Sequence, residues 1–239
     1  MATTLDSMRE NVIVFTQDEY NKLKEADYEM FGAATLKFYS KKKPYDKMHN
    51  ISGDGSAIEW VLSGTSEIVT DWVEGFSIIK RVEYPAGVSG ERRLPELERD
   101  SWLVLKTDTS TIKFRLLSVT PASSETVRIT YTVPHILSST QSTIYQEDEK
   151  AFEALWASLA CKAIAANYAH LKDSFIDADV TDGQKLSAQF NVMSEQFKEV
   201  WNEHFPDPVV SLEKDLDIGF AWKTASGGGD FLTHPRKWR

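Results

Sequence analysis

The sequence predicts an α+β fold. It has a helical core (an N-terminal helix plus two long antiparallel helices), an inserted antiparallel β-module and an extended C-terminal tail. Three observations predict this class. Apolar residues recur every three or four positions over 143–205, they alternate with polar residues in much of 50–135, and Pro-Asp-Pro at 206–208 ends the helical pattern. The expected parts are 1–49, the N-terminal arm and helix; 50–137, the β-module; 138–206, the helical pair; and 207–239, the tail.

The helical pair is the framework to which the other parts are attached. Thr143 with Gln146, and Thr181 with Gln184, fit the Ser/Thr-x-x-Glu/Gln capping box and predict a helix start at each threonine. The apolar residues of both helices fall on one stripe of a 3.6-residue repeat, which predicts that each helix packs through one face. Large apolar residues on these stripes are Phe152, Trp156, Phe190, Phe197 and Trp201.

The N-terminal part contains an apolar run, a capping box and a run of lysines. Residues 12–15 could form an arm or a strand laid on a neighbour, and Thr16–Glu19 predicts the start of a helix that continues to about Phe31. The helical pattern weakens over 38–40. Lysines 41–43 could contact DNA or phosphate, but a solvated loop is the favoured interpretation.

The β-module is predicted to be a small antiparallel sheet or barrel of five or six strands. Ser52–Gly55 carries the glycines and aspartate of a tight turn and lacks the spacing of a phosphate-binding loop. Alternation is clearest in 127–133, where the odd positions are apolar, as in a half-buried strand. The six candidate strands are 58–62, 68–73, 76–84, 101–106, 111–117 and 126–133.

Composition excludes several classes of protein. The formal net charge of -9 and pI of about 5.1 argue against a nucleic-acid coat, which needs a basic face, although an acidic wall can still line a DNA path. Cys161 is the single cysteine, so no intrachain disulfide can form, and we expect a buried thiol and intracellular folding. We expect no signal peptide and no membrane span, since no run approaches the ~18 apolar residues that a span requires.

No catalytic, cofactor or metal site is predicted. The five histidines lack zinc-site spacing, and His204 falls on the apolar stripe of the second helix, where we expect a core or interface residue. Asp177, Asp179 and Thr181 have the spacing of a calcium loop but lack its glycine and closing glutamate, so a solvated acidic turn is favoured. An enzyme is therefore disfavoured.

The tail is predicted to dock on another chain. It combines aromatic and basic residues around the glycines at 227–229, and such aromatic groups would be exposed if they were unpacked. A disordered tail is the alternative. The candidate docking residues are Phe220, Trp222, Phe231, His234, Arg236, Lys237, Trp238 and Arg239.

The order of these parts resembles the head-to-tail connector (adaptor) proteins of tailed bacteriophages over residues 15–205. The similarity lies in patterns of packing residues. The segments that carry it are Trp72-x-x-Gly75-Phe76-Ser77-x-Ile79, Val82-Glu83-Tyr84-Pro85, Ile129-Thr130-Tyr131-Thr132-x-Pro134-His135, Gln146-Glu147-Asp148-Glu149-x-Ala151 and the Ala-rich 157–168.

The resemblance implies a structural virion protein without a cofactor, at the capsid vertex after assembly in the host cytoplasm. About twelve copies would form a ring below the portal protein, bound through the tail. The two long helices would pack side by side and against neighbouring copies, with the candidate subunit-packing residues Phe152, Trp156, Phe190, Phe197 and Trp201. The opposite side of the ring would bind a neck or tail protein, and DNA would pass through its channel without specific binding. Two alternatives remain: another ring-forming virion protein such as a tail terminator, and a cytoplasmic enzyme or small-molecule binder with a composite site.

Overall fold

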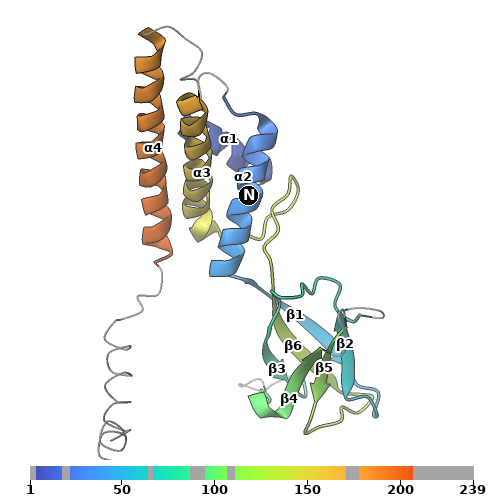
Figure 1. Ribbon diagram of the computed structural model, residues 1–239. Coiled ribbons are helices and arrows are strands. Elements are labelled where there is room, and N and C mark those ends of the chain that lie inside the picture. The colour runs from blue at the N-terminus through green and yellow to red at the C-terminus, as the bar shows by residue number, and fades with distance from the viewer. Residues whose placement is uncertain are drawn as a thin grey trace, which may run out of the picture. The chain divides into compact units, whose positions relative to one another are not determined.

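The computed structural model describes residues 4–17, 22–63, 67–86, 95–106, 111–170 and 178–206. The chain divides into two compact units, Met1–Trp201 and Asn202–Arg239. Within the described residues, helices precede and follow a group of antiparallel strands, which confirms the predicted α+β class (Figure 1). In this part of the chain no helix is both long and apolar enough to cross a membrane.

Two helices, rather than one, form the N-terminal part. Helix α1 (Leu5–Thr16) contains residues 12–15, so the prediction of an arm or strand there is wrong; Met8 and Val12, one helical turn apart, are completely buried. Thr16 ends α1 instead of starting a helix, and its buried hydroxyl lies 3.0 Å from the hydroxyl of Tyr28. The Thr16 hydroxyl also donates to the carbonyl oxygen of Ile13 at 3.0 Å, so it is engaged within α1 rather than in the predicted capping box.

Helix α2 (Glu25–Lys42) starts later and ends later than predicted. Its start is fixed by Asp27, whose Oδ2 accepts a hydrogen bond from the amide of Lys24 at 2.8 Å. The helix continues through residues 38–42, where a weakening was expected, because Tyr39 and Ser40 are buried on its inner side.

The long helical pair is confirmed as α3 (Glu149–His170) and α4 (Ala178–His204), but neither predicted capping box starts a helix. Thr143 lies before the short 3₁₀ helix η2 (Gln146–Asp148), and its hydroxyl accepts a hydrogen bond from the amide of Ile136 at 2.8 Å. Thr181 lies inside α4. Thr143 thus closes the loop that begins at Ile136 and does not cap a helix.

The β-module consists of two three-stranded antiparallel sheets, with strand orders β1-β6-β3 and β2-β5-β4. Five predicted strands are confirmed with small changes at their ends, whereas 68–73 forms turns and bends. The first strand was not predicted, and it begins at Tyr45, ahead of the expected start of the module at residue 50. The strands are β1 (Tyr45–Ser52), β2 (Glu59–Ser63), β3 (Ile79–Glu83), β4 (Trp102–Lys106), β5 (Ile112–Leu116) and β6 (Thr126–Val133); a 3₁₀ turn, η1 (Arg99–Ser101), precedes β4.

Strand β6 is the central strand of the first sheet and confirms the predicted alternation. Its odd-numbered residues from Val127 to Val133 are buried. They share one apolar core with residues of the second sheet, so the two sheets pack face to face. Members of this core from the second sheet are Leu62, Trp102, Ile112, Phe114 and Leu116.

The turn predicted at Ser52–Gly55 is present. The Asp54 carboxylate accepts hydrogen bonds from the amides of Ser56 at 2.8 Å and Ala57 at 2.6 Å. Gly55 has φ +84°, in the left-handed region that glycine adopts without strain. A Cβ atom at Gly53 would lie 2.3 Å from the carbonyl oxygen of Ala122, so only glycine fits there. This turn is structural.

Candidate functional site

Helix α3 packs against α2 through large aromatic side chains. The indole Nε1 of Trp156 donates a hydrogen bond to the carbonyl oxygen of Tyr28 at 2.8 Å. One turn earlier, the ring of Phe152 lies 5.8 Å from that of Tyr39, at nearly a right angle. Because Trp156 and Phe152 are completely buried, this contact belongs to the core of the chain.

Helix α3 packs against α4 through small polar side chains. The hydroxyl of Ser194 donates to the carbonyl oxygen of Ser158 at 2.9 Å and lies 3.1 Å from the Ser158 hydroxyl. Farther along, Ser187 donates to the carbonyl oxygen of Ala165 at 2.9 Å. Serines in these positions let two helices approach closely while the hydroxyls remain bonded.

These contacts fix the directions of the three helices. From η2 along α3, residues 148, 156 and 167 contact residues 39 and 28 of α2 and residue 22 just before it, so α2 runs antiparallel to α3. Residues 158 and 165 of α3 contact residues 194 and 187, so α4 is also antiparallel to α3. Helices α2 and α4 are therefore parallel to each other.

Helices α2 and α4 also lie on opposite sides of α3. Trp156 faces α2 and Ser158 faces α4, and two positions correspond to about 200° around a helix. Other positions of α3 show the same arrangement, since Phe152 contacts Tyr39 of α2 and the carbonyl oxygen of Ala165 accepts a hydrogen bond from Ser187 of α4. Helix α1 bridges the group, with Asn11 bonded to Glu153 of α3 at 2.8 Å and Phe15 6.2 Å from Phe197 of α4.

The outer faces of α2 and α4 have different compositions. On α2, the exposed residues opposite the α3 contact are apolar in the first half and basic in the second. On α4 the corresponding row is apolar and then acidic. Met30 and Val192 are 58% and 57% exposed. The row on α2 is Ala26, Met30, Ala33, Lys37 and Lys41, and the row on α4 is Ala188, Val192, Glu195 and Glu199.

The predicted subunit-packing residues are mostly inside the chain. Phe152 and Trp156 are completely buried, and Phe190 and Trp201 are nearly so. Phe190 stacks on Tyr168 with ring centroids 5.8 Å apart. Only Phe197 is partly exposed. Four of the five therefore hold the helices of one copy together and offer little surface to a neighbour.

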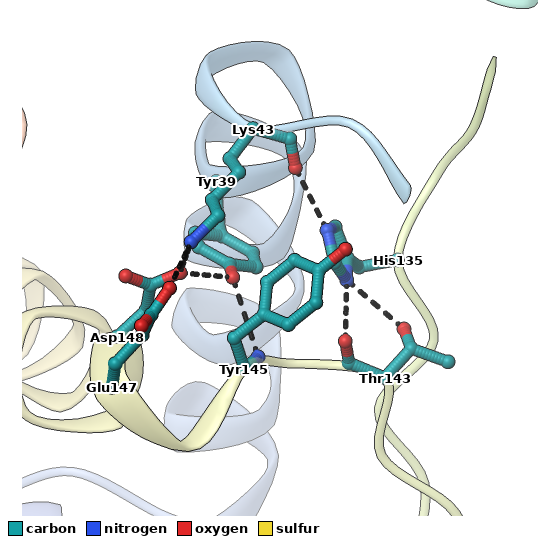
Figure 2. Close-up of polar contacts among 7 residues, drawn as sticks. All are labelled: Tyr39, Lys43, His135, Thr143, Tyr145, Glu147 and Asp148. Carbon is teal, nitrogen blue, oxygen red and sulfur yellow. Dashed lines mark hydrogen bonds and ion pairs between the residues drawn. The ribbon is translucent and has the colours of Figure 1, made fainter. Parts of the chain in front are cut away.

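A polar cluster joins the β-module to the helices, with His135 at its centre (Figure 2). The Nε2 atom of His135 lies 2.7 Å from the carbonyl oxygen of Lys43, at the end of α2. Its Nδ1 lies 2.9 Å from the carbonyl oxygen and 3.0 Å from the hydroxyl of Thr143. Since His135 follows β6 directly, one ring connects β6, α2 and the loop before η2.

The protonation of His135 follows from these partners. Burial lowers the pKa of His135, although the carbonyl oxygens of Lys43 and Thr143 oppose the shift. A neutral ring fits these partners when Nε2–H donates to the Lys43 carbonyl oxygen and Nδ1 accepts from the Thr143 hydroxyl; the Thr143 carbonyl oxygen, 2.9 Å from Nδ1, is then a close neighbour without a hydrogen bond. Both ring nitrogens are thus bonded within the chain, which leaves neither for a substrate.

Asp148 forms the second half of the cluster. Its Oδ2 accepts hydrogen bonds from the Tyr39 hydroxyl and from Lys43 Nζ, both at 2.7 Å, and Lys43 also reaches Glu147 at 2.7 Å. Burial and the bond to Asp148 raise the pKa of Tyr39. Burial alone would lower the pKa of Lys43, but the bonds to Asp148 and Glu147 raise it. Lys43 is therefore a structural cation, while Lys41 and Lys42 form the end of α2.

A cavity of about 360 Å³ lies beside the cluster, lined in part by His135 and Thr143. Two charged groups of its lining are also engaged: Lys47 pairs with Asp71, which accepts a hydrogen bond from Tyr131 at 2.6 Å. Their bonds outweigh burial and lower the pKa of Asp71. These groups therefore hold one another in place, and they give little support to a composite catalytic site.

The remaining predicted residues are placed as follows. Cys161 is completely buried, as expected, whereas His204 is exposed, so the expectation of a core position for this histidine is wrong and that of an interface position stays a prediction. Among the described residues, no group of three or more His, Cys, Asp or Glu side chains could hold a metal ion. The calcium-like side chains around 177–181 and all tail residues from Phe220 to Arg239 lie outside the part of the chain whose side chains the structure describes.

Sequence reasoning missed His135, Tyr39 and Lys43 as one cluster. His135 lies about ninety residues from Tyr39 and Lys43 in the sequence, and no local spacing links it to them. The available signal was weak: the acidic run at 147–149 contains Glu147 and Asp148, the two carboxylates that Lys43 contacts. Comparison with known proteins adds nothing further, since no family model and no curated protein matches the chain.

Proposed function

We propose that this protein is a head-to-tail adaptor of a tailed bacteriophage, a virion protein whose copies form a ring below the portal and continue the DNA channel. The observation that carries the proposal is the order α2–α3–α4, with two different outer faces on opposite sides of one helix. A closed ring requires two different surfaces of one chain to meet. The resemblance over residues 15–205 supplies the position of that ring.

The polar cluster around His135 supports the same role. An adaptor must transmit position between the head and the tail, which requires rigid connections between its parts. His135, Asp148 and Lys43 tie the end of β6 to α2 and to the start of α3 through bonds of 2.7–3.0 Å. The net charge of -9 suits a wall that DNA passes without binding, because carboxylates repel phosphates.

Imaging of assembled particles tests the proposal. The full chain is incubated with portal-bearing capsids, and the copies at the vertex are counted by electron microscopy. We expect a ring below the portal with an acidic lumen. A ring of another symmetry at the end of the tail would instead indicate a tail terminator. Absence from the vertex, or a lumen lined mainly by Lys and Arg, would contradict the adaptor role.

Deletion of residues 226–239 tests the role of the tail. We expect the truncated chain to keep the circular dichroism spectrum and thermal midpoint of the full chain but to lose attachment to portal-bearing capsids. Normal attachment of the folded, truncated chain would overturn tail docking, and the ring could then still contact the portal by another surface.

A further inference from the structure

We infer that copies of this chain associate head to tail, with the outer face of α4 of one copy lying parallel against the outer face of α2 of the next. Lys37 and Lys41 of α2 then pair with Glu195 and Glu199 of α4. The inference deepens the proposed function and rests on it only for the closure of the ring, because the match between the two faces is a property of the chain itself.

The first argument is charge complementarity. Lys37 and Lys41 are exposed and one turn apart, and so are Glu195 and Glu199. None of the four takes part in an ion pair in the described residues. Residues four apart lie on the same side of a helix, and the distance between them is the same in every helix. Two parallel helices can therefore bring both lysines opposite both glutamates.

The second argument is the match of the apolar residues in the same register. With Lys37 beside Glu195 and Lys41 beside Glu199, counting back seven positions brings Met30 beside Ala188 and Ala34 beside Val192. Met30 and Val192 are both more than half exposed in the single chain. Association would remove them from water next to small residues that allow the helices to approach closely.

The third argument is direction. Helices α2 and α4 are both antiparallel to α3, so they are parallel to each other. Copies related by rotation about an axis along the helices keep these directions, so α4 of one copy meets α2 of the next in parallel. A two-fold contact between two α2 helices would place no acidic row opposite the lysines.

Charge reversal tests the inference in the full chain. One variant carries Lys37→Glu and Lys41→Glu, and a second carries Glu195→Lys and Glu199→Lys. Sedimentation velocity of the wild-type chain over a concentration series should show self-association. Each variant alone should associate about tenfold more weakly or worse, because two attractive pairs become repulsive.

Restoring opposite charges at the contact tells the loss of direct pairing apart from damage to the fold. A chain with all four changes, and an equimolar mixture of the two variants, should both recover association, since each places opposite charges together again. The matched control is Lys150→Glu with Lys162→Glu, which reverses two exposed lysines of α3 and should associate as the wild type does. A monomeric wild type, unchanged association of the single variants, or no recovery in the mixture would overturn the inference.

The outcomes also distinguish this inference from the proposed function. If both charge-reversed variants still form complete rings on portal-bearing capsids, then α2 and α4 do not form the contact, and the adaptor role stands. If the wild type associates through α2 and α4 but never binds those capsids, the contact stands and the adaptor role fails.

Discussion

Gly32 of α2 and Trp156 of α3 lie so close together that a Cβ atom added at Gly32 would sit 2.7 Å from Cζ2 of the indole. The indole is completely buried and is held by its hydrogen bond to the carbonyl oxygen of Tyr28, so it cannot move aside. Glycine is therefore required at this position by packing, although it is a poor helix former.

The Gly32→Ala variant should be less stable than the wild type. Alanine improves helix propensity by ~1 kcal/mol, but overpacking against a rigid ring costs ~1–3 kcal/mol, so the free energy of unfolding should fall by about 1 kcal/mol. Urea denaturation followed by circular dichroism measures the change. Trp156→Phe should cost less in the Gly32→Ala background than in the wild type, because the smaller ring relieves the clash. A stabilised Gly32→Ala variant would contradict this packing.

Ser158 and Ser194 should be energetically coupled across the contact between α3 and α4. Ser194→Ala removes the donor to the Ser158 carbonyl oxygen and a partner of the Ser158 hydroxyl, and it should cost about 1–2 kcal/mol. A double-mutant cycle with Ser158→Ala measures the coupling, which should exceed about 0.5 kcal/mol. Additive effects of the two alanines would mean that the hydroxyls act independently.

The sequence predicts the fold best where a pattern is both regular and local. Strand β6 was predicted at its observed bounds because Val127, Ile129 and Tyr131 alternate with polar residues and are buried on one face. Strand β1 was missed because Lys47 and Met48 are exposed and Ile51 alone of its residues is buried, so the strand shows no clear apolar face. The start of α2 was misplaced because Thr16 fits a capping box while its hydroxyl bonds within α1.

The interaction surfaces could be predicted only in part. Apolar spacing identified the side of α3 and α4 that is buried, but it could not tell a contact inside the chain from one between copies. The structure shows that Phe152 and Trp156 are completely buried within one chain. The choice depends on where α2 lies, and α2 is more than a hundred residues from α3 in the sequence. The exposed rows on α2 and α4 become significant only after that position is known.

His135 should make stability fall at mildly acidic pH. Burial lowers its pKa below the ordinary value of 6.5 in the folded chain, so the unfolded chain binds more protons as the pH falls through that value. The contribution of neutral His135 is therefore complete above about pH 6.5 and is lost progressively below it, as the pH approaches the lower folded pKa. Urea denaturation at pH 7.5, 6.5 and 5.5 measures the slope.

The control for this slope is His135→Gln, which can donate to the Lys43 carbonyl oxygen but does not titrate. This variant should be less stable at pH 7.5, since it loses the contact with the Tyr39 ring, whose centroid is 4.5 Å away. Its stability should change less than that of the wild type between pH 7.5 and 5.5. Equal slopes in the two proteins would assign the pH dependence to other groups.

Cys161 should be unreactive in the folded chain. It is completely buried in α3, and burial raises the pKa of its thiol to about 12, so the reactive thiolate is scarce at pH 8. A disulfide reagent such as dithionitrobenzoate should release one equivalent of chromophore in denaturant and almost none under native conditions. Two positions of α3 near Cys161, Ser158 and Ala165, contact α4, so slow native reaction would report opening of that contact. Ser194→Ala, which weakens the same contact, should therefore speed the native reaction about tenfold for each 1.4 kcal/mol lost. A fast native reaction in the wild type, or no acceleration by Ser194→Ala despite a measured loss of stability, would contradict the packing of α4 over this part of α3.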